Sequence, residues 1–357
     1  MNTYTQFLIK NYLISLLNVF FIFFSLIFIL NLLTELEFFK KSDVSTFFPL
    51  YLALINTPMF IFEMFPFIFL ISTQVFFSNL FNNNEINIFK YSGLKNSKIF
   101  SIITFTIFFL GVLMIAIFYN LSSNLKNLYL GLKSNHTEDN KYLAVITNNG
   151  LWIKDIFDEK ILMINAGSVN QNELLDAYIS EFDKNYEIIR NIKSKKIDIT
   201  NKLWIIKNAE IYIQNNKEIV DEIELNSNFD YKIIQNLFSN MSSLSFLELI
   251  EMRQNYKKLN YSLTEIDLQL LKLISFPFYF SLMFIFAGII MMNTKSFKNK
   301  TFKITIGLFA SVIIYYINNF FYILGSSEKL SVSSSIFLPL LSFALINLIL
   351  LRKINAK

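Results

Sequence analysis

The sequence predicts an α-helical membrane protein with six transmembrane helices, three before and three after an inserted, water-exposed all-β domain of jelly-roll-like type. Of its 357 residues, 54% are hydrophobic and 17% are charged, whereas about 25% of the residues in soluble domains are charged. The mean hydropathy of the chain is +0.44. The apolar residues form runs of about 20, the length that a helix needs to cross the hydrocarbon of a bilayer.

Three apolar runs in the first part of the chain predict the first three helices. The run from Asn11 to Leu33 is followed by Glu35 and Glu37. This run is longer than the apolar core of a signal peptide, and no small-residue cleavage site follows it, so we expect a retained helix. The next two runs extend from about Pro49 to Leu80 and from about Ile99 to Tyr119.

The last part of the chain supplies three more apolar runs. They extend over about Leu268–Met292, Phe302–Leu324 and Val332–Leu351. Between the two groups of runs lies a long polar region. The sequence therefore predicts a transmembrane domain at 1–120, a β domain at 121–261 and a second transmembrane domain at 262–357.

The distribution of Lys and Arg predicts the orientation, because short cytoplasmic loops are enriched in these residues. With the N-terminus inside, the inner segments carry ten Lys and Arg residues and the short outer loops carry three. We therefore expect both termini to be cytoplasmic and the central domain to lie across the membrane. The inner residues are Lys10, Lys90, Lys95, Lys98, Lys295, Lys298, Lys300, Arg352, Lys353 and Lys357; the outer ones are Lys40, Lys41 and Lys329.

The central region has short segments of alternating polarity separated by polar turns, the pattern of β-strands. Successive strands without intervening helices predict an antiparallel sandwich or jelly roll. A helix near Ser243–Asn255 then leads back to the membrane. The expected strands are Tyr142–Thr147, Leu151–Ile156, Ile161–Ala166, Leu174–Phe182, Glu187–Lys196, Lys202–Gln214 and Glu218–Leu225.

Motifs of enzymatic chemistry are missing from the sequence. There is no Cys and there is one His, His136, which leaves neither a thiol nucleophile nor a His-rich metal centre. Phosphate-binding, dinucleotide-binding, nucleophile-elbow and zinc-protease motifs are also missing. We therefore predict no catalytic residue, no metal site, no cofactor and no nucleic-acid partner, and we expect any energy source to lie in another protein.

A short amphipathic segment, residues 82–95, lies on the predicted cytoplasmic side between the second and third apolar runs. Ile86 and Phe89 recur at roughly helical spacing, Glu85 lies near the start, and Gly93 is a typical helix stop. Such a helix either offers a docking element to a cytosolic motor or lies at the lipid interface. Periodicity alone leaves both interpretations open.

The stretch from Pro58 to Phe100 resembles the signature of the LptF/LptG family of lipopolysaccharide-export permeases. In that family a Pro-rich second helix precedes a small-x-Ser-Glu-Leu segment, to which Asn84–Ile86 corresponds, and an Ala-Ser-Gly turn, to which Tyr91–Gly93 corresponds. The resemblance continues in the same order through the rest of the chain. Its later parts are Thr147–Asp155, similar to a Gly-Leu-Trp strand of LptG, the segment around Trp204, Leu271–Gly288 and the last two helices.

The resemblance implies transport of lipopolysaccharide out of the bacterial inner membrane. The partners it implies are a sister permease of LptF type, a dimeric cytosolic ATPase of LptB type, and an LptC-like periplasmic bridge protein that receives the lipid through β-jellyroll domains. By the same resemblance Glu85, with Ile86, Phe89 and Gly93, would form the contact with the ATPase. The Gly-Leu-Trp strand favours LptG over LptF.

Two ionisable residues lie inside predicted membrane helices, Glu63 in the second and Lys272 in the fourth. A charge at the bilayer centre costs about 2.5–3.5 kcal/mol on insertion scales, so we expect a partner or a wet cavity and hypothesise that both residues face one interior. The resemblance adds Lys40 and Lys41 as candidate contacts for lipid phosphates. Where typical members have charges near these lysines, this chain has Asn31 and Thr34.

Two alternatives remain open on the sequence. A membrane-anchored protein whose outer domain binds or assembles a partner would show no stable association with an ATPase. A related exporter permease that moves lipoproteins or peptides would share the helical layout but not the lipid. The main prediction is a non-enzymatic permease subunit that extracts a large amphiphile from the membrane and passes it to a β-sheet bridge.

Overall fold

A computed structural model describes residues 2–41, 44–45, 47–134, 151–158, 160–170, 172–213, 216–231, 233–234, 241–258, 261–292 and 300–355. These residues form two compact units. The helical unit comprises Met1–Tyr129, Ser242–Leu249 and Leu263–Lys357, and the β unit comprises Leu130–Met241 and Ile250–Ser262. The predicted strand at Tyr142–Thr147 and His136 lie outside the described residues.

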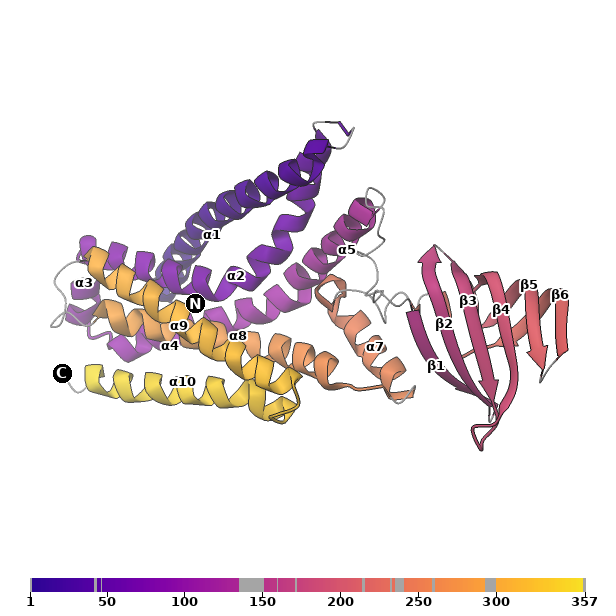
Figure 1. Cartoon of the computed structure of the whole chain (residues 1–357). Coiled ribbons are helices and arrows are strands. Elements are labelled where there is room, and N and C mark those ends of the chain that lie inside the picture. The colour runs from indigo at the N-terminus through magenta and orange to yellow at the C-terminus, as the bar shows by residue number, and fades with distance from the viewer. Residues whose placement is uncertain are drawn as a thin grey trace. The chain divides into compact units, whose positions relative to one another are not determined.

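Six helices of the described residues are long and apolar enough to cross a membrane, which confirms the predicted number (Figure 1). The third of them combines α4, a π-helical turn η2 and α5. A short helix, α3, separates the second from the third. The elements are α1 (Thr3–Phe38), η1 (Phe39–Lys41), α2 (Phe47–Asn82), α3 (Glu85–Tyr91), α4 (Asn96–Leu113), η2 (Met114–Tyr119), α5 (Asn120–Ser134), η3 (Met241–Ser243), α7 (Phe246–Lys258), α8 (Thr264–Met292), α9 (Lys300–Ser326) and α10 (Val332–Asn355).

Helices α2 and α8 form the centre of the helical unit. In each, 67% of the most apolar window is buried, against 17% in α1 and 11% in α9. Aromatic side chains fill the centre: the rings of Phe69 on α2 and Phe280 on α8 stack at 4.8 Å. Helices α1 and α9 therefore present most of their apolar side chains outward, as helices do that face lipid or another membrane helix.

The third membrane helix is longer than its apolar run predicts. The apolar run predicts an end near Tyr119, but the helix continues as α5 to Ser134. This extension is amphipathic rather than apolar, so a hydropathy criterion misses it. Its buried face includes Ser122, Ser123 and Tyr129.

The β unit contains six antiparallel strands that pair in sequence order, β1-β2-β3-β4-β5-β6 (Figure 1). Short turns join neighbouring strands, and alternate side chains point to one buried face. The strands are β1 (Leu151–Phe157), β2 (Lys160–Asn170), β3 (Glu173–Phe182), β4 (Ile188–Asp198), β5 (Leu203–Ile213) and β6 (Asn216–Asn226). The predicted all-β insertion is confirmed, and its described strands form a meander rather than the paired Greek keys of a jelly roll.

The sheet is rolled so that the residues after β6 reach β1 at the opposite edge. The buried carboxylate of Asp155 on β1 accepts the hydroxyl of Ser227 at 2.7 Å and the backbone N–H of Asn228 at 2.9 Å. The indole N–H of Trp204 on β5 donates to the carbonyl oxygen of Phe229 at 2.8 Å. Rolling encloses an apolar core on the inner face, which includes Ile164, Ile179, Ile192 and Ile206.

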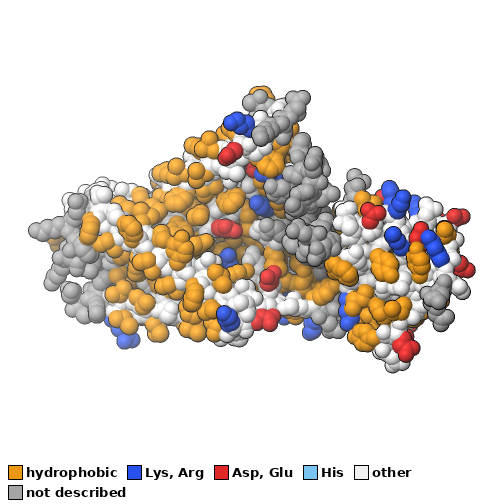
Figure 2. Space-filling model, viewed as in Figure 1, with side chains coloured by type: hydrophobic (Ala, Val, Ile, Leu, Met, Phe, Trp, Pro, Cys, Tyr) orange, Lys and Arg blue, Asp and Glu red, His pale blue; other side chains and the backbone are white. Residues whose placement is uncertain are grey.

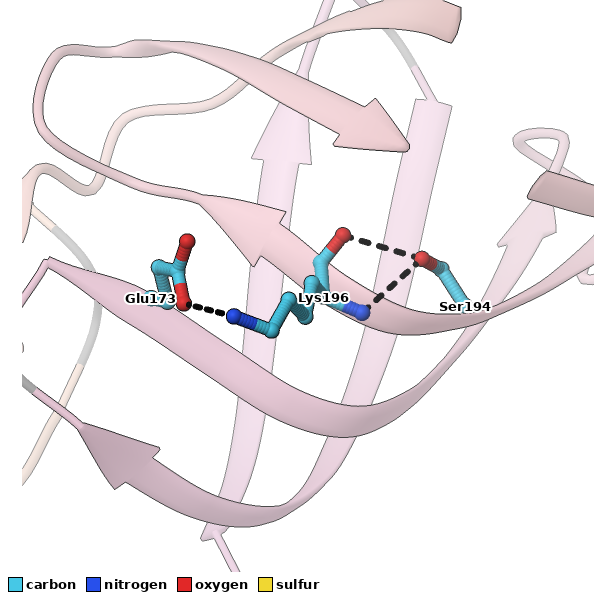
Figure 3. Close-up of polar contacts among 3 residues, drawn as sticks. All are labelled: Glu173, Ser194 and Lys196. Carbon is cyan, nitrogen blue, oxygen red and sulfur yellow. Dashed lines mark hydrogen bonds and ion pairs between the residues drawn. The ribbon is translucent and has the colours of Figure 1, made fainter. Parts of the chain in front are cut away.

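The surfaces of the two units differ in chemistry. In Figure 2, hydrophobic side chains are spread over the visible helical surface, whereas charged side chains gather over the strands. One such exposed pair is Lys196 with Glu173, whose charged atoms are 3.0 Å apart (Figure 3). Exposed pairs of this kind contribute about 0–1 kcal/mol. The hydroxyl of Ser194 beside it accepts the backbone N–H of Lys196 at 3.1 Å.

The β unit should lose stability in acid through Glu181, whose side chain is 1% exposed. Burial disfavours the charged carboxyl, but hydrogen bonds and charges from Lys160 and Arg190 outweigh burial and hold its pKa below the ordinary value. A lowered folded-state pKa stabilises the fold at neutral pH, and that stability is lost as the pH falls below about 4.3 through the folded-state pKa. The Glu181→Gln variant should lack this pH-dependent part of the folding stability, because glutamine does not titrate.

Tryptophan fluorescence measures this effect in the full chain, because both tryptophans, Trp152 and Trp204, lie in the β unit. At neutral pH the free energy of unfolding of the Gln variant should be about 2 kcal/mol lower than that of the wild type, which is typical of hydrogen bonds to a charged group. Equal slopes of unfolding free energy against pH in the wild type and the variant would contradict the assignment.

Candidate functional site

A cavity of about 240 Å³ lies among α2, α8, α9 and α10 of the helical unit. Prolines shape two of its walls: Pro66 in α2 and Pro339 in α10. A proline has no N–H to donate to the carbonyl four residues earlier, so the carbonyls of Phe62 and Ser335 lose their usual donors. Of these two residues, Ser335 lines the cavity.

Most of the side chains that line the cavity are polar or aromatic, which is unusual at membrane depth. Glu63 lies in the middle of α2, and Lys272 lies in the third turn of α8. Helix α9 contributes two adjacent amides and two tyrosines. Among the described residues, the lining comprises Glu63, Pro66, Lys272, Ser275, Phe276, Tyr279, Tyr315, Asn318, Asn319, Tyr322, Ser335, Ile336, Pro339 and Leu340.

The structure brings Glu63 and Lys272 to the same cavity, as the sequence hypothesis supposed. Their charges interact electrostatically, yet no ion pair or hydrogen bond joins either side chain to another within the described part of the chain. The Lys272 ammonium lies 5.4 Å from the ring centre of Tyr322 and 6.0 Å from that of Phe276. Aromatic faces attract such a cation without neutralising it.

One buried hydroxyl of the lining is left without a well-formed hydrogen bond. Tyr279 is 8% exposed, and its hydroxyl has no partner in hydrogen-bonding geometry among the described residues, although Asn318 lies beside it. A buried hydroxyl without a partner is costly. The site therefore favours a polar occupant, whether water or the polar part of a ligand.

The lysines proposed to contact lipid phosphates lie elsewhere. Lys40 and Lys41 belong to η1 at the end of α1, and Lys40 is not among the residues that line the cavity of Glu63 and Lys272. Lys40 is exposed. The four candidate lipid-binding residues thus divide into two pairs, one at a helix end and one inside the helical unit.

Polar contacts near the end of α1 were not predicted from the sequence. The Tyr129 hydroxyl of α5 donates to the buried carboxylate of Glu35 at 2.8 Å. The Lys126 ammonium donates to the Asn56 side chain on α2 at 2.8 Å. These residues attach α5 to α1 and α2. Their signal in the sequence is the amphipathic spacing of Lys126 and Tyr129, which an apolar-run criterion ignores.

The predicted docking segment contains the seven-residue helix α3. Glu85 is its first residue, and Asn83 donates to its carboxylate at 3.3 Å. Gly93, at φ +80°, follows the end of the helix in the left-handed conformation that glycine adopts without strain. The helix is shorter than the predicted segment 82–95, but Glu85 lies at its start and Gly93 follows its end, as the sequence predicts.

The two apolar residues predicted for docking instead pack α3 against other helices of the same chain. Ile86 is 3% exposed, and the ring of Phe89 packs edge to face on Phe7 of α1 at 6.0 Å. The outward apolar side chains are Ile88 and Tyr91, which are 62% and 91% exposed. Sequence reasoning missed them because it followed one apolar face of the segment, and these two residues lie on another.

The fold and cavity define a polytopic membrane protein in which a β unit is inserted between two groups of membrane helices. The family model described as lipopolysaccharide export system permease LptF/LptG matches residues 6–353. The chain therefore belongs to the LptF/LptG family. It is a permease of lipopolysaccharide export and a multi-pass protein of the inner membrane, and its family is one of transport rather than of catalysis. A comparison with curated proteins finds no match.

Proposed function

We propose that this chain is one permease subunit of an ABC-type exporter that extracts lipopolysaccharide from the inner membrane and passes it to a periplasmic β-jellyroll bridge. The family match over residues 6–353 carries the proposal. A dimeric cytosolic ATPase of LptB type supplies the energy, an LptF-like sister completes the membrane part, and an LptC-like protein forms the bridge. The Gly-Leu-Trp strand supports an LptG-like rather than an LptF-like role.

In the proposed topology both termini are cytoplasmic. Residues 1–120 and 262–357 form the transmembrane domains, and 121–261 form the periplasmic domain. The excess of Lys and Arg in the segments on the α3 side supports this orientation. It places α3 in the cytoplasm, where an ATPase can reach it.

The outward faces of α1 and α9 support a second permease subunit. Both helices expose large apolar side chains along their length, such as Phe21 and Leu30 on α1 and Phe309 and Phe320 on α9. Without water to drive association, membrane helices meet through close packing. A sister subunit that packs near these helices would enclose a space for lipid acyl chains, which the small cavity of Glu63 and Lys272 does not provide.

Helix α3 is proposed to transmit the motion of the ATPase. Glu85, Ile86, Phe89 and Gly93 are the proposed coupling residues, and their roles differ. Ile86 and Phe89 fix the helix to the membrane helices, so a displacement of α3 moves α1 through the contact with Phe7. Glu85 and the outward-facing residues Ile88 and Tyr91 are proposed to contact the ATPase.

Co-purification tests the ATPase partnership. Tagged wild-type chain, expressed with the ATPase and the sister permease, should bring down both from detergent, whereas Glu85→Lys should bring down the sister but little ATPase. The matched control is Glu218→Lys, the same charge reversal at an exposed residue of β6. An ATPase that never associates with the wild type, or that associates equally with Glu85→Lys, would reject the coupling role of α3.

A further inference from the structure

The cavity among α2, α8, α9 and α10 holds two opposite charges that form no ion pair with one another. Glu63 and Lys272 both line it, but they lie farther apart than an ion pair. A charge at membrane depth that has no ion-pair partner costs several kcal/mol on some scales and is rare for that reason. Two such charges across one small space point to an occupant that supplies the opposite charge to each.

We propose that this cavity binds a zwitterionic lipid headgroup with an ammonium and a phosphate, of the phosphoethanolamine class. Glu63 accepts the ammonium of the headgroup, and Lys272 donates to its phosphate. The carbonyl of Ser335, whose usual donor is replaced by Pro339, is a second acceptor for the ammonium. Lysine binds phosphate as a point charge, which suits a side chain reaching across a cavity.

The size and openness of the cavity agree with a headgroup rather than a whole lipid. Its volume of about 240 Å³ lies below the usual range of about 300–1,000 Å³ for sites that enclose drug-sized ligands. Glu63 and Asn319 on its lining are exposed, so acyl chains attached to the headgroup can leave sideways along the apolar surface of the helices. The unpartnered hydroxyl of Tyr279 and the amide of Asn318 supply further polar contacts inside.

The same headgroup chemistry has two sources in a membrane: phosphatidylethanolamine, and lipopolysaccharide that carries phosphoethanolamine substituents. The first source makes the cavity a site for a resident phospholipid. The second makes it part of the substrate path, and only that version rests on the proposed function. Binding is therefore measured on the purified chain without ATPase, so that a failure of the transport proposal does not decide the result.

Native mass spectrometry of the full chain in detergent tests the proposal. We expect phosphatidylethanolamine to be retained about tenfold better than anionic phosphatidylglycerol, the equivalent of one charged contact. Glu63→Gln and Lys272→Gln should each reduce retention about tenfold. The conservative variants Glu63→Asp and Lys272→Arg should retain the lipid, and Glu37→Gln and Lys329→Gln, at exposed positions outside the cavity, serve as controls.

The choice of lipids distinguishes the two sources of the headgroup, phosphatidylethanolamine and substituted lipopolysaccharide. Retention of phosphatidylethanolamine that depends on both charges assigns the site to a phospholipid. Retention only of phosphoethanolamine-bearing lipopolysaccharide, and not of the unsubstituted form, assigns it to the substrate. Three results would overturn the proposal: binding of phosphatidylethanolamine and phosphatidylglycerol to the same measurable extent, binding of neither phosphatidylethanolamine nor phosphoethanolamine-bearing lipopolysaccharide, or lipid retention that is unchanged in both Gln variants.

Discussion

Replacement of Gly111 by alanine should destabilise the helical unit, although alanine is the better helix former. Gly111 lies on α4 where this helix meets α8, and an added Cβ would lie 2.8 Å from the Cα of Pro277 and 3.2 Å from the ring of Phe280. The nearest atom belongs to the backbone, so the two helices would have to separate. Overpacking in a well-packed core costs about 1–3 kcal/mol.

A matched control lies in the same continuous helix. A Cβ on Gly131 of α5 meets nothing within 4 Å, so Gly131→Ala should be neutral or stabilising by up to about 1 kcal/mol, the difference in helix propensity. Thermal denaturation in detergent, followed by the loss of monodisperse protein, compares the two. Equal midpoints for Gly111→Ala and Gly131→Ala would show that α4 and α8 do not pack as closely as described.

The ATPase should be lost from the complex when Ile88 is replaced by aspartate, while the chain itself stays folded. Ile88 is 62% exposed on α3, so the change removes an outward apolar contact without disturbing the interior. Central apolar contacts of an interface contribute about 2 kcal/mol or more each, which lowers affinity by roughly 30-fold or more. Pull-down against an ATPase concentration series measures the change.

The comparison with Ile86→Asp separates docking from folding. Ile86 is 3% exposed, and an aspartate there would bury a charge without a partner, so this variant should lose thermal stability. Ile88→Asp should keep the wild-type midpoint. If Ile86→Asp weakened ATPase binding at full stability and Ile88→Asp did not, the docking face would be the one predicted from the sequence.

The membrane helices could be predicted because the bilayer imposes one simple criterion, an apolar run of sufficient length. All six were placed correctly in the chain, with ends that differ from the observed ones. The largest difference is α5, where Ser122, Ser123 and Lys126 end the apolar run but not the helix. Helices that extend beyond the hydrocarbon are stabilised by contacts such as that of Lys126 with Asn56, which only the fold reveals.

Alternation predicts the strands, and all five neighbouring pairs among the six strands follow the sequence order because short connections join adjacent segments. The rolling of the sheet was not predictable. It depends on Asp155 at one edge and Ser227 beyond the other, residues far apart in sequence whose pairing no local pattern indicates. Asp155 at an inward-facing position of the alternating strand β1 is the local indication that its carboxylate has a polar partner.

The candidate site was predicted in part. Charges inside apolar runs are conspicuous, and for that reason Glu63 and Lys272 were selected. Asn318, Asn319 and Tyr322 on α9 were missed, because single polar residues hardly change the hydropathy of a long run. The sequence predicts a helix within 82–95, and the observed α3 is shorter. The direction of each side chain depends on packing against Phe7 and the neighbouring helices.

The most direct test of the central claim is ATP-dependent movement of lipopolysaccharide by the reconstituted complex. Proteoliposomes containing this chain, its sister permease, the bridge protein and the ATPase are mixed with a soluble β-jellyroll acceptor that carries a photo-crosslinker. We expect crosslinks to lipopolysaccharide that require ATP and are lost with Glu85→Lys but not with Glu218→Lys. Crosslinking without ATP, or none with a complex whose ATPase is active, would contradict the central claim.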